Sequence, residues 1–216
     1  MKTFLQLVNT TLVGIREESA ANVSQDEYVS MIAKFVNDAK QQVEDAYDWS
    51  AYVTEYDITT VANQSLYSLV GSDNRAKIDF VIDTVTGGLL REGSRKALSI
   101  LVLKDNQAAV IADRYANNGV DANGDATIRL FPTPSDVRII TTSGWWRPTD
   151  LVDNDDKLLI PHAPVQDLAL AMAVRERGEV SGQTSLEYFE IAKRSLSDAI
   201  AYDSARNDEE TTWYVQ

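Results

Sequence analysis

The chain has 216 residues, 44% of them hydrophobic, and its 33 acidic and 20 basic residues give a net charge of −13. This length suits one large domain or one domain with an insertion. The negative charge disfavours the counterion release that drives most affinity for DNA or RNA, so we exclude nucleic-acid recognition as the main function.

Cysteine is absent, which excludes a disulfide framework, a thiolate metal site and a thiol nucleophile. No apolar run approaches the roughly 20 residues of a membrane helix. The apolar patch at residues 4–8 is interrupted by Gln6 and followed by Asn9, Thr10 and Thr11, which spoils a secretory core. We therefore expect neither membrane insertion nor export.

Two antiparallel helices are predicted before residue 50. Residues 3–18 keep helical spacing with Leu5, Val8, Leu12 and Ile15. Residues 24–49 form the longest amphipathic segment, and Ser24 with Glu27 predicts a capping box at its start. Its apolar face comprises Tyr28, Ile32, Phe35, Ala39, Val43 and Ala46. Its polar face comprises Lys34, Asp38, Gln41, Gln42 and Asp45.

From Ser50 onward the composition changes to β-forming and turn residues. Short strands are predicted near residues 52–54, 58–61, 65–69, 78–86, 127–131 and 137–146. Asn123 and Gly124 indicate a hairpin turn. Residues 98–103 fit either a buried strand or a helix, and residues 105–115 favour a helix. The section up to residue 157 thus predicts antiparallel β-structure with one short helix.

Two more helices are predicted near residues 164–178 and 184–206. Pro164 suits the first helical position, and Gly178 suits the residue that ends the helix. Thr184 and Glu187 indicate a second capping box. The first of these helices should turn Val165, Leu168, Ala169 and Met172 inward. The second should turn Leu186, Phe189, Ala192, Leu196, Ala199 and Ile200 inward.

The predicted class is therefore α+β: a helical bundle built from the N- and C-terminal helix pairs, with an inserted antiparallel β-rich domain. Residues 1–50 and 158–206 would form the two halves of the bundle, and residues 51–157 the insertion. Residues 207–216 would form an extended C-terminal arm.

No catalytic, metal or cofactor site is predicted. The sole histidine, His162, has no neighbouring ligand and indicates a structural or solvent-facing role. Asp121, Asn123 and Asp125 have the spacing of a calcium loop, but the expected later glycine and glutamate are missing, so a hairpin turn is favoured. The glycines at 87, 88 and 93 lack the Lys-Ser/Thr ending of a phosphate loop.

Three groups of residues are candidates for contacts with other proteins. Adjacent Trp145 and Trp146 should point to opposite faces of a strand, so either one fills each of two packed layers or one is exposed. Asp153, Asp155 and Asp156 belong to an acidic loop that is either simply solvated or offers a charged contact to a neighbour.

The third candidate is the C-terminal arm. Asn207, Asp208, Glu209 and Glu210 are too polar to pack, whereas the chain then ends in a β-prone segment containing Trp213, Tyr214 and Val215. Either Trp213 folds back onto its own bundle, or the segment orders on a partner as an added strand or as aromatic anchors.

Several segments together resemble the head-to-tail adaptor (connector) proteins of tailed bacteriophages. They are residues 3–9, Tyr47-Asp48-Trp49, residues 58–60 and 66–69, the strand and Pro-x-Pro turn at 127–134, Trp146-Arg147-Pro148 and Leu159-Ile160-Pro161. The resemblance spans nearly the whole chain, and residues 98–115 match the pattern least.

The resemblance implies a non-enzymatic structural protein of the virion neck, assembled in the host cytoplasm. It implies a homo-oligomeric ring, a dodecamer, that docks on the portal protein, prolongs the DNA channel and offers a platform to a tail or nozzle protein. DNA would pass through without specific binding, and the arm would reach the portal. Two alternatives come from the residues themselves: a carbohydrate- or protein-binding module that uses exposed Trp or Tyr of the β domain, and a hydrolase that uses some of the many carboxylates.

Overall fold

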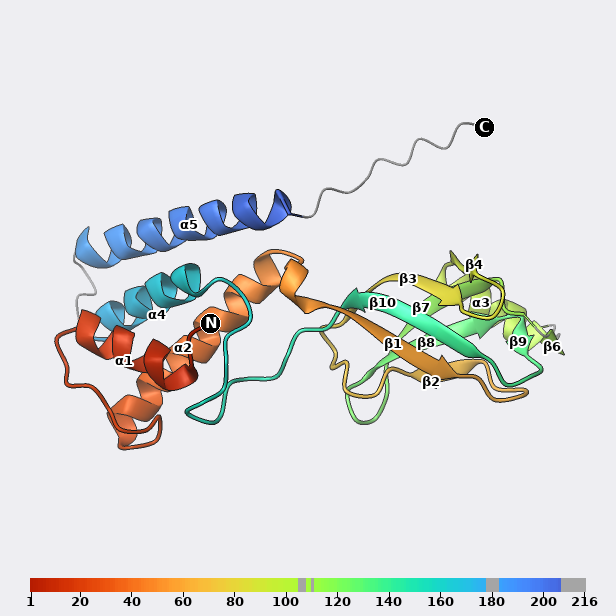
Figure 1. Ribbon diagram of the computed structural model, residues 1–216, viewed down its shortest axis with the longest axis horizontal. Helices are drawn as coiled ribbons and strands as arrows, with labels where there is room; N and C mark the ends of the chain where they lie inside the picture. Colours follow the sequence, from red (N-terminus) through yellow and green to blue (C-terminus); the bar gives the residue numbers. More distant parts are fainter. Residues whose placement is uncertain (105–107, 110, 178–182, 207–216) are drawn as a thin grey trace. The chain divides into compact units, whose positions relative to one another are not determined.

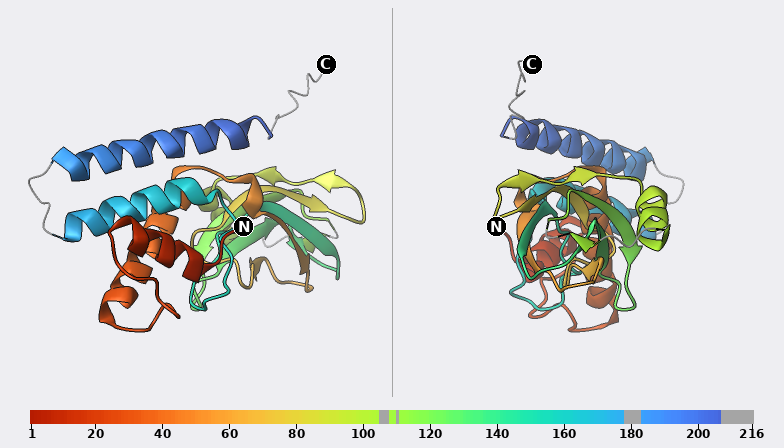
Figure 2. Two further views of the ribbon diagram at one scale, coloured as in Figure 1. Left: turned by 60° about the vertical axis from the view of Figure 1, so that its left-hand side comes forward. Right: turned by 90° about the vertical axis from the view of Figure 1, so that its right-hand side faces the viewer.

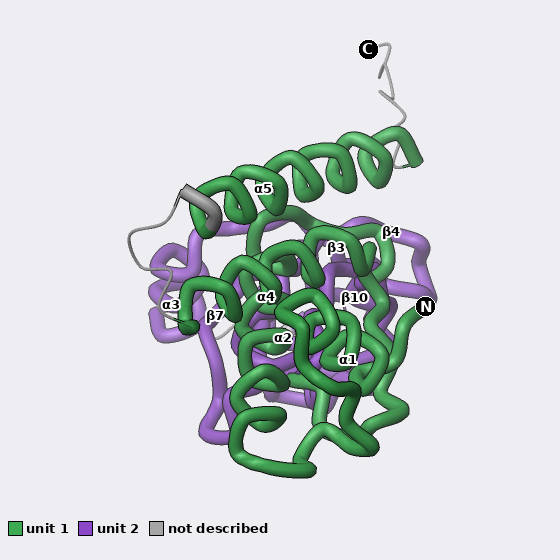
Figure 3. The backbone as a smooth tube through the Cα atoms, turned by 90° about the vertical axis from the view of Figure 1, so that its left-hand side faces the viewer, with its two compact units in different colours: residues 1–51, 150–216 green, residues 52–149 purple. Residues whose placement is uncertain are grey.

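The computed structural model describes residues 1–104, 108–109, 111–177 and 183–206, which form helices and both antiparallel and parallel strand pairs (Figure 1). The expected α+β class is therefore confirmed. The chain divides into two compact units, which we call unit 1 (residues 1–51 and 150–216) and unit 2 (residues 52–149) (Figure 3).

Among its described residues, unit 1 contains four α-helices from the two ends of the chain: α1 (Phe4–Gly14), α2 (Glu27–Ala46), α4 (His162–Glu176) and α5 (Gln183–Ser204). Helix α4 packs against the other three. Because it has neighbours on several sides, its buried residues do not form a single stripe, and the alanines at 169, 171 and 173 are all fully buried. Such small side chains allow the helix axes to approach closely.

The start of α2 differs from the prediction. Its N-cap is Asp26, whose carboxylate accepts a hydrogen bond from the Val29 amide at 2.8 Å. The Ser24 amide instead donates to the Asn22 side chain, so the predicted capping box of Ser24 and Glu27 is wrong. A carboxylate at this position satisfies a free amide and also complements the positive end of the helix dipole. A true capping box occurs at α1, between Thr3 and Gln6.

The ends of the other helices also shift. Helix α4 begins at His162 after Pro161, so Pro164 does not occupy the first helical position. Gly178 and the side chain of Thr184 lie outside the described residues. After α2, Trp49 is buried and its indole N–H donates to the Val43 carbonyl at 2.8 Å. This bond satisfies one of the carbonyls that the end of a helix leaves without a partner.

Unit 2 is built from two four-stranded sheets. The first has the order β1 (Val53–Thr59), β10 (Ile139–Trp145), β3 (Lys77–Asp83), β4 (Gly88–Leu89). The second has the order β2 (Leu66–Ser68), β8 (Ala126–Phe131), β7 (Arg114–Val120), β5 (Arg91–Glu92). Two short strands, β6 (Ala108–Ala109) and β9 (Thr133–Pro134), pair separately; η1 (Ser50–Tyr52) and α3 (Arg95–Lys104) complete the elements.

Antiparallel pairing dominates unit 2, although β5 pairs with β7 and β6 with β9 in parallel. The core lies between the two sheets, where Ile58 and Ile140 of the first sheet belong to the same buried cluster as Ile128 and Leu130 of the second (Figures 1 and 2). The ambiguous residues 98–103 are helical, as part of α3.

The predicted helix at residues 105–115 is wrong in its described part. Ala108 and Ala109 form β6, and Tyr115 lies in β7 opposite Leu130 of β8. The Tyr115 side chain is buried in the core between the sheets. Its strand conformation follows from this pairing with a distant strand, which outweighs a weak local helical pattern.

Gly144 in β10 provides a test of packing in unit 2. A Cβ atom here would lie 2.2 Å from the Lys77 carbonyl oxygen and 2.7 Å from Cζ3 of Trp146. We expect Gly144→Ala to lower the free energy of unfolding by about 1–3 kcal/mol, because the Lys77 backbone cannot move aside freely. Urea denaturation measures the change, and Gly88→Ala is the matched control, since a Cβ there meets only Thr86 Oγ1 at 3.4 Å. Equal effects of the two substitutions would contradict the prediction.

Candidate functional site

The adjacent tryptophans Trp145 and Trp146 are both half-buried. Lys77 Nζ lies 5.1 Å from the Trp145 ring centroid, a cation–π geometry. Trp146 packs against the core of unit 2, and its backbone amide donates to the Tyr52 carbonyl at 3.0 Å. Neither indole N–H has a hydrogen-bond partner among the described residues. The pair thus combines a core anchor with a cation–π contact, and both indole N–H groups are buried inside the protein.

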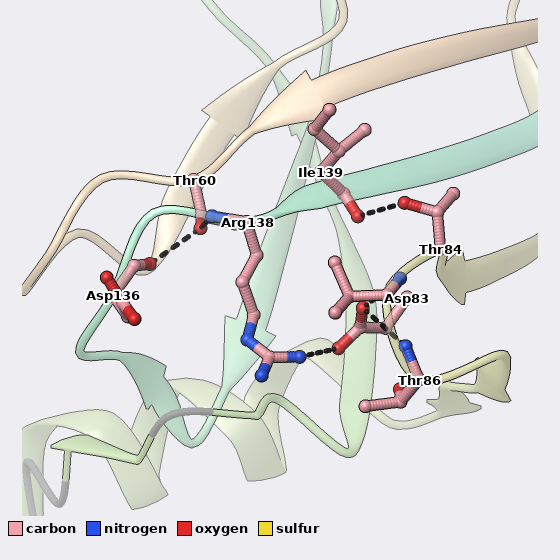
Figure 4. Close-up of polar contacts among 8 residues, drawn as sticks. Thr60, Asp83, Thr84, Thr86, Asp136, Arg138 and Ile139 are labelled. Atoms are coloured by element: carbon pink, nitrogen blue, oxygen red, sulfur yellow. Dashed lines mark hydrogen bonds and ion pairs between the residues drawn. The ribbon is translucent and has the colours of Figure 1, made fainter.

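A buried ion pair joins β3 to the chain just before β10 (Figure 4). Arg138 Nη1 lies 2.6 Å from Asp83 Oδ2, and the two side chains are only 17% and 3% exposed. The other Asp83 oxygen accepts from the Val85 amide at 2.9 Å. Thr60 Oγ1 accepts from the Arg138 amide and donates to the Asp136 carbonyl, both at 2.8 Å. The network fixes one end of the first sheet.

Asp83 is therefore held in its ionised form. Burial by itself would raise its pKa, but hydrogen bonds from the Val85 amide and Arg138 outweigh burial and lower the pKa below its ordinary value of 3.8. Because the folded pKa is lowered, the stabilisation is fully present above pH 3.8 and is lost as the pH falls through the folded pKa.

We expect Asp83→Asn to lower the free energy of unfolding by about 1–3 kcal/mol at neutral pH, because the charged acceptor of Arg138 is lost. The deficit should shrink as the pH falls below about 4, because the unfolded wild-type chain then binds a proton at Asp83 more readily than the folded protein does. Denaturation midpoints measured from pH 7 to pH 3 test this. A deficit that stays constant over that range would show that the charge of Asp83 does not stabilise the fold.

The acidic loop that contains Asp153, Asp155 and Asp156 holds the start of α1. The Phe4 and Leu5 amides, which have no partner within the helix, donate to the Asp156 and Asn154 carbonyls at 2.8 and 3.2 Å. Asp156 Oδ2 accepts from the Val152 and Asp153 amides at 2.7 and 2.8 Å, and these bonds lower the pKa of Asp156. Asp153 and Asp155 are exposed. The structure thus places these two carboxylates outward from a firmly held loop.

The hairpin interpretation of Asp121, Asn123 and Asp125 is confirmed. These residues join β7 to β8, and Gly124 adopts φ +93° in the turn. Asp121 Oδ1 accepts from the Asn123 and Asp125 amides at 2.8 and 3.1 Å. No cluster of three potential metal ligands occurs within the described ranges.

His162 is exposed, and partial desolvation together with the positive charge of Lys2 lowers its pKa.

Sequence reasoning missed a buried ion pair in α2. Lys40 Nζ lies 2.9 Å from Glu44 Oε1, and their side chains are 1% and 0% exposed. By contrast, Ala46 of the predicted apolar face is exposed, and Tyr28 and Phe35 are half-buried. The buried face of α2 is thus wider than the predicted apolar face. Its additional residues could have been found from the sequence, because Ala33, Val36, Lys40 and Glu44 follow one another at spacings of three or four.

The structure does not bring the predicted contact residues together into one site. Trp145 and Trp146 belong to unit 2, and Asp153, Asp155 and Asp156 to unit 1. Trp213, Tyr214 and Val215 lie outside the described residues. Near the start of α5, Leu186 is 68% exposed, so the prediction that it faces inward is wrong. None of the described helices is both long enough and apolar enough to cross a membrane.

Comparison with known proteins identifies the chain's family. The family model described as SU10 adaptor protein matches residues 2–214, which is almost the full length. A search of curated proteins finds no match. The family match confirms the resemblance to phage head-to-tail adaptors that the sequence segments indicated. The chain therefore belongs to the SU10 adaptor protein family, a family of phage adaptor proteins.

Proposed function

We propose that this chain is a structural virion protein that forms a ring at the neck of a tailed phage. The ring, a dodecamer, docks on the portal protein, extends the DNA channel and provides the platform to which a tail or nozzle protein attaches. Assembly takes place in the host cytoplasm before the protein enters the virion. The observation that carries the proposal is the family match over residues 2–214.

We propose separate roles for the two units. Unit 1 draws helices from both ends of the chain, and we propose that its N- and C-terminal helix pairs act as one bundle next to the portal. The outward carboxylates of Asp153 and Asp155, on a loop fixed to α1, offer charged contacts to a neighbouring protein. In unit 2, the half-buried side chains of Trp145 and Trp146 are candidates for contacts between copies.

Reconstitution with the portal protein of the same phage tests the proposed function. Purified chain is mixed with assembled portal, and the complex is isolated by density-gradient sedimentation and imaged by electron cryomicroscopy. We expect a ring of twelve copies coaxial with the portal. Absence of co-sedimentation at a large excess of the chain would overturn the proposal, and a ring of a different number would correct its stoichiometry.

Weak DNA binding is expected for a protein that lets the genome pass. With a net charge of −13, the surface repels phosphates and gains little from counterion release. Titration of fluorescent duplex DNA at physiological salt should therefore show no saturable binding in the micromolar range, and no specific sequence preference. A salt-sensitive, sub-micromolar affinity would contradict the prediction.

No observation favours the alternative of a carbohydrate-binding module. That alternative needs exposed aromatic rings, whereas the tyrosines and tryptophans of unit 2 that the structure describes are all buried or half-buried. Tyr67, for example, is buried, and its hydroxyl is occupied by the Val61 amide and by the Val61 and Gln64 carbonyls. A stacking platform requires a ring face open to solvent.

A further inference from the structure

Strand β1 is an edge strand seven residues long. It pairs with β10 along its whole length, from Val53 opposite Trp145 to Thr59 opposite Ile139. No strand among the described residues pairs with its other side. An edge of this length presents a row of backbone groups that another chain can use as a template.

The residues whose backbone groups face outward follow from the register. The Trp146 amide donates to the Tyr52 carbonyl, and the Thr60 amide donates to the Arg138 carbonyl at 2.8 Å. In an antiparallel pair, successive residues point their backbone groups alternately toward and away from the partner strand. Even-numbered residues of β1 therefore bond to β10, and the odd-numbered ones point outward: Val53, Glu55, Asp57 and Thr59.

These four residues are available for contact. All four are exposed, and the outward amides and carbonyls make no hydrogen bond with any residue that the structure describes. The other margin of the first sheet is different. There β4 is followed directly by Leu90, whose amide donates to Val81 of β3, and by Arg91 of β5, whose amide donates to Asp113. The two sheets of unit 2 are thus continuous through β4 and β5, whereas the edge at β1 has no partner strand in the part of the chain that the structure describes.

A second copy of β1 is a poor occupant of this edge. The outward residues alternate, so antiparallel pairing of two β1 strands sets Glu55 opposite Asp57, Glu55 opposite Glu55, or Asp57 opposite Asp57 in the three longest registers. Like charges directly opposite each other destabilise a strand pair. The chain's own C-terminal segment is also disfavoured, because Asp208, Glu209 and Glu210 precede it.

We propose that the open edge of β1 binds an extended segment of a partner protein that carries Lys or Arg at alternate positions. The segment adds a strand beside β1 by backbone hydrogen bonds, and its basic side chains lie next to the carboxylates of Glu55 and Asp57 on the exposed face. Thr141 Oγ1 already donates to Asp57 Oδ1 at 2.5 Å and so orients that carboxylate. The inference deepens the proposed function, on which it rests for the role of the partner as a neck protein.

The probe is a capped seven-residue peptide of alternating valine and lysine, titrated into the 15N-labelled full chain. We expect the amide signals of Val53, Glu55, Asp57 and Thr59 to shift and their hydrogen exchange to slow. A matched peptide with glutamate in place of lysine should bind at least about tenfold more weakly, because its charges repel the edge.

Proline substitutions test whether peptide binding depends on the outward backbone groups of β1 rather than on those that bond to β10. Glu55→Pro removes an outward amide and should abolish peptide binding while the fold is retained, because an edge strand tolerates proline where its amide faces solvent. Tyr56→Pro is the matched control, since it removes an amide that bonds to β10 and should lower the thermal midpoint. The double variant Glu55→Lys/Asp57→Lys keeps every amide and should reverse the preference in favour of the glutamate peptide.

Three results would overturn the inference: no binding of the lysine peptide to the wild type, equal binding of the two peptides, or an unchanged preference in the lysine double variant. Loss of fold in Glu55→Pro leaves the double variant as the deciding test. Portal co-sedimentation is measured in parallel. If the wild type binds portal but not the lysine peptide, the edge inference alone fails; if it does not bind portal, the proposed function fails.

Discussion

Lys40→Met should lower the free energy of unfolding by about 3–5 kcal/mol, because it leaves the Glu44 carboxylate buried without the ammonium group that neutralises it. The two atoms lie 2.9 Å apart, and the side chains are 1% and 0% exposed. Methionine keeps most of the volume of the lysine stem, so the loss measures charge rather than a cavity. Urea denaturation monitored by tryptophan fluorescence gives the value directly.

Two controls make this test sharp. The double variant Lys40→Met/Glu44→Leu removes both charges and should recover most of the loss, since a buried ion pair replaced by apolar side chains is often no less stable. Lys193→Met removes one member of the exposed pair Lys193 and Glu190, whose side chains are 71% and 70% exposed, and should change the midpoint little. A loss in Lys40→Met no larger than in Lys193→Met would show that the buried pair is not a significant stabilising element.

The same pair shows where sequence reasoning was limited. Helical periodicity correctly placed α2 and the burial of Ile32, Ala39 and Val43. It assigned faces by hydrophobicity, however, and so took no account of two charged residues that neutralise each other inside the protein. A charge is excluded from a core only when it lacks a partner, and a partner four residues away on the same helix is visible in the sequence.

Pairing between distant segments was much less predictable. The strand positions of β3, β8 and β10 were approximately right because β-branched residues and turn dipeptides mark them locally. The two short strands predicted near residues 52–54 and 58–61 are wrong as separate elements, because they belong to one continuous strand, β1. By contrast, β7 was partly taken for a helix, since its conformation depends on pairing with β8. Asp83 and Arg138 stand 55 residues apart, and nothing in the local sequence of either indicates the other. The outward register of β1 likewise follows only from its pairing with β10.

Some features of the candidate contact segments could be predicted from the sequence, and others could not. Segments such as Tyr47-Asp48-Trp49 supported the family assignment, and the structure gives Trp49 a physical role as a buried residue whose indole N–H satisfies the end of α2. The sequence predicts an acidic loop that is either solvated or a charged contact to a neighbour, and neither alternative includes its role in holding the first amides of α1. That role depends on backbone carbonyls, which no side-chain pattern reveals.

Deleting residues 207–216 should abolish attachment to portal particles while leaving the thermal midpoint of the isolated chain nearly unchanged. The two effects have separate causes. Residues 207–210 are too polar and acidic to pack, so the deletion is expected to remove little buried surface from the free protein. Trp213, Tyr214 and Val215 supply two large aromatic side chains and a β-branched one, the kind of residues that dominate binding energy at interfaces.

The substitution series Trp213→Ala, Tyr214→Ala and Gln216→Ala locates the effect within the arm. If aromatic anchors carry the docking, the first two should each weaken portal co-sedimentation at least about tenfold, because truncating a central aromatic anchor commonly costs 2 kcal/mol or more. Gln216→Ala, which alters the arm without removing an aromatic ring, should bind as the wild type does. If the truncated chain binds portal at wild-type affinity, docking belongs to another surface; if it unfolds at a markedly lower temperature, Trp213 instead packs on its own bundle.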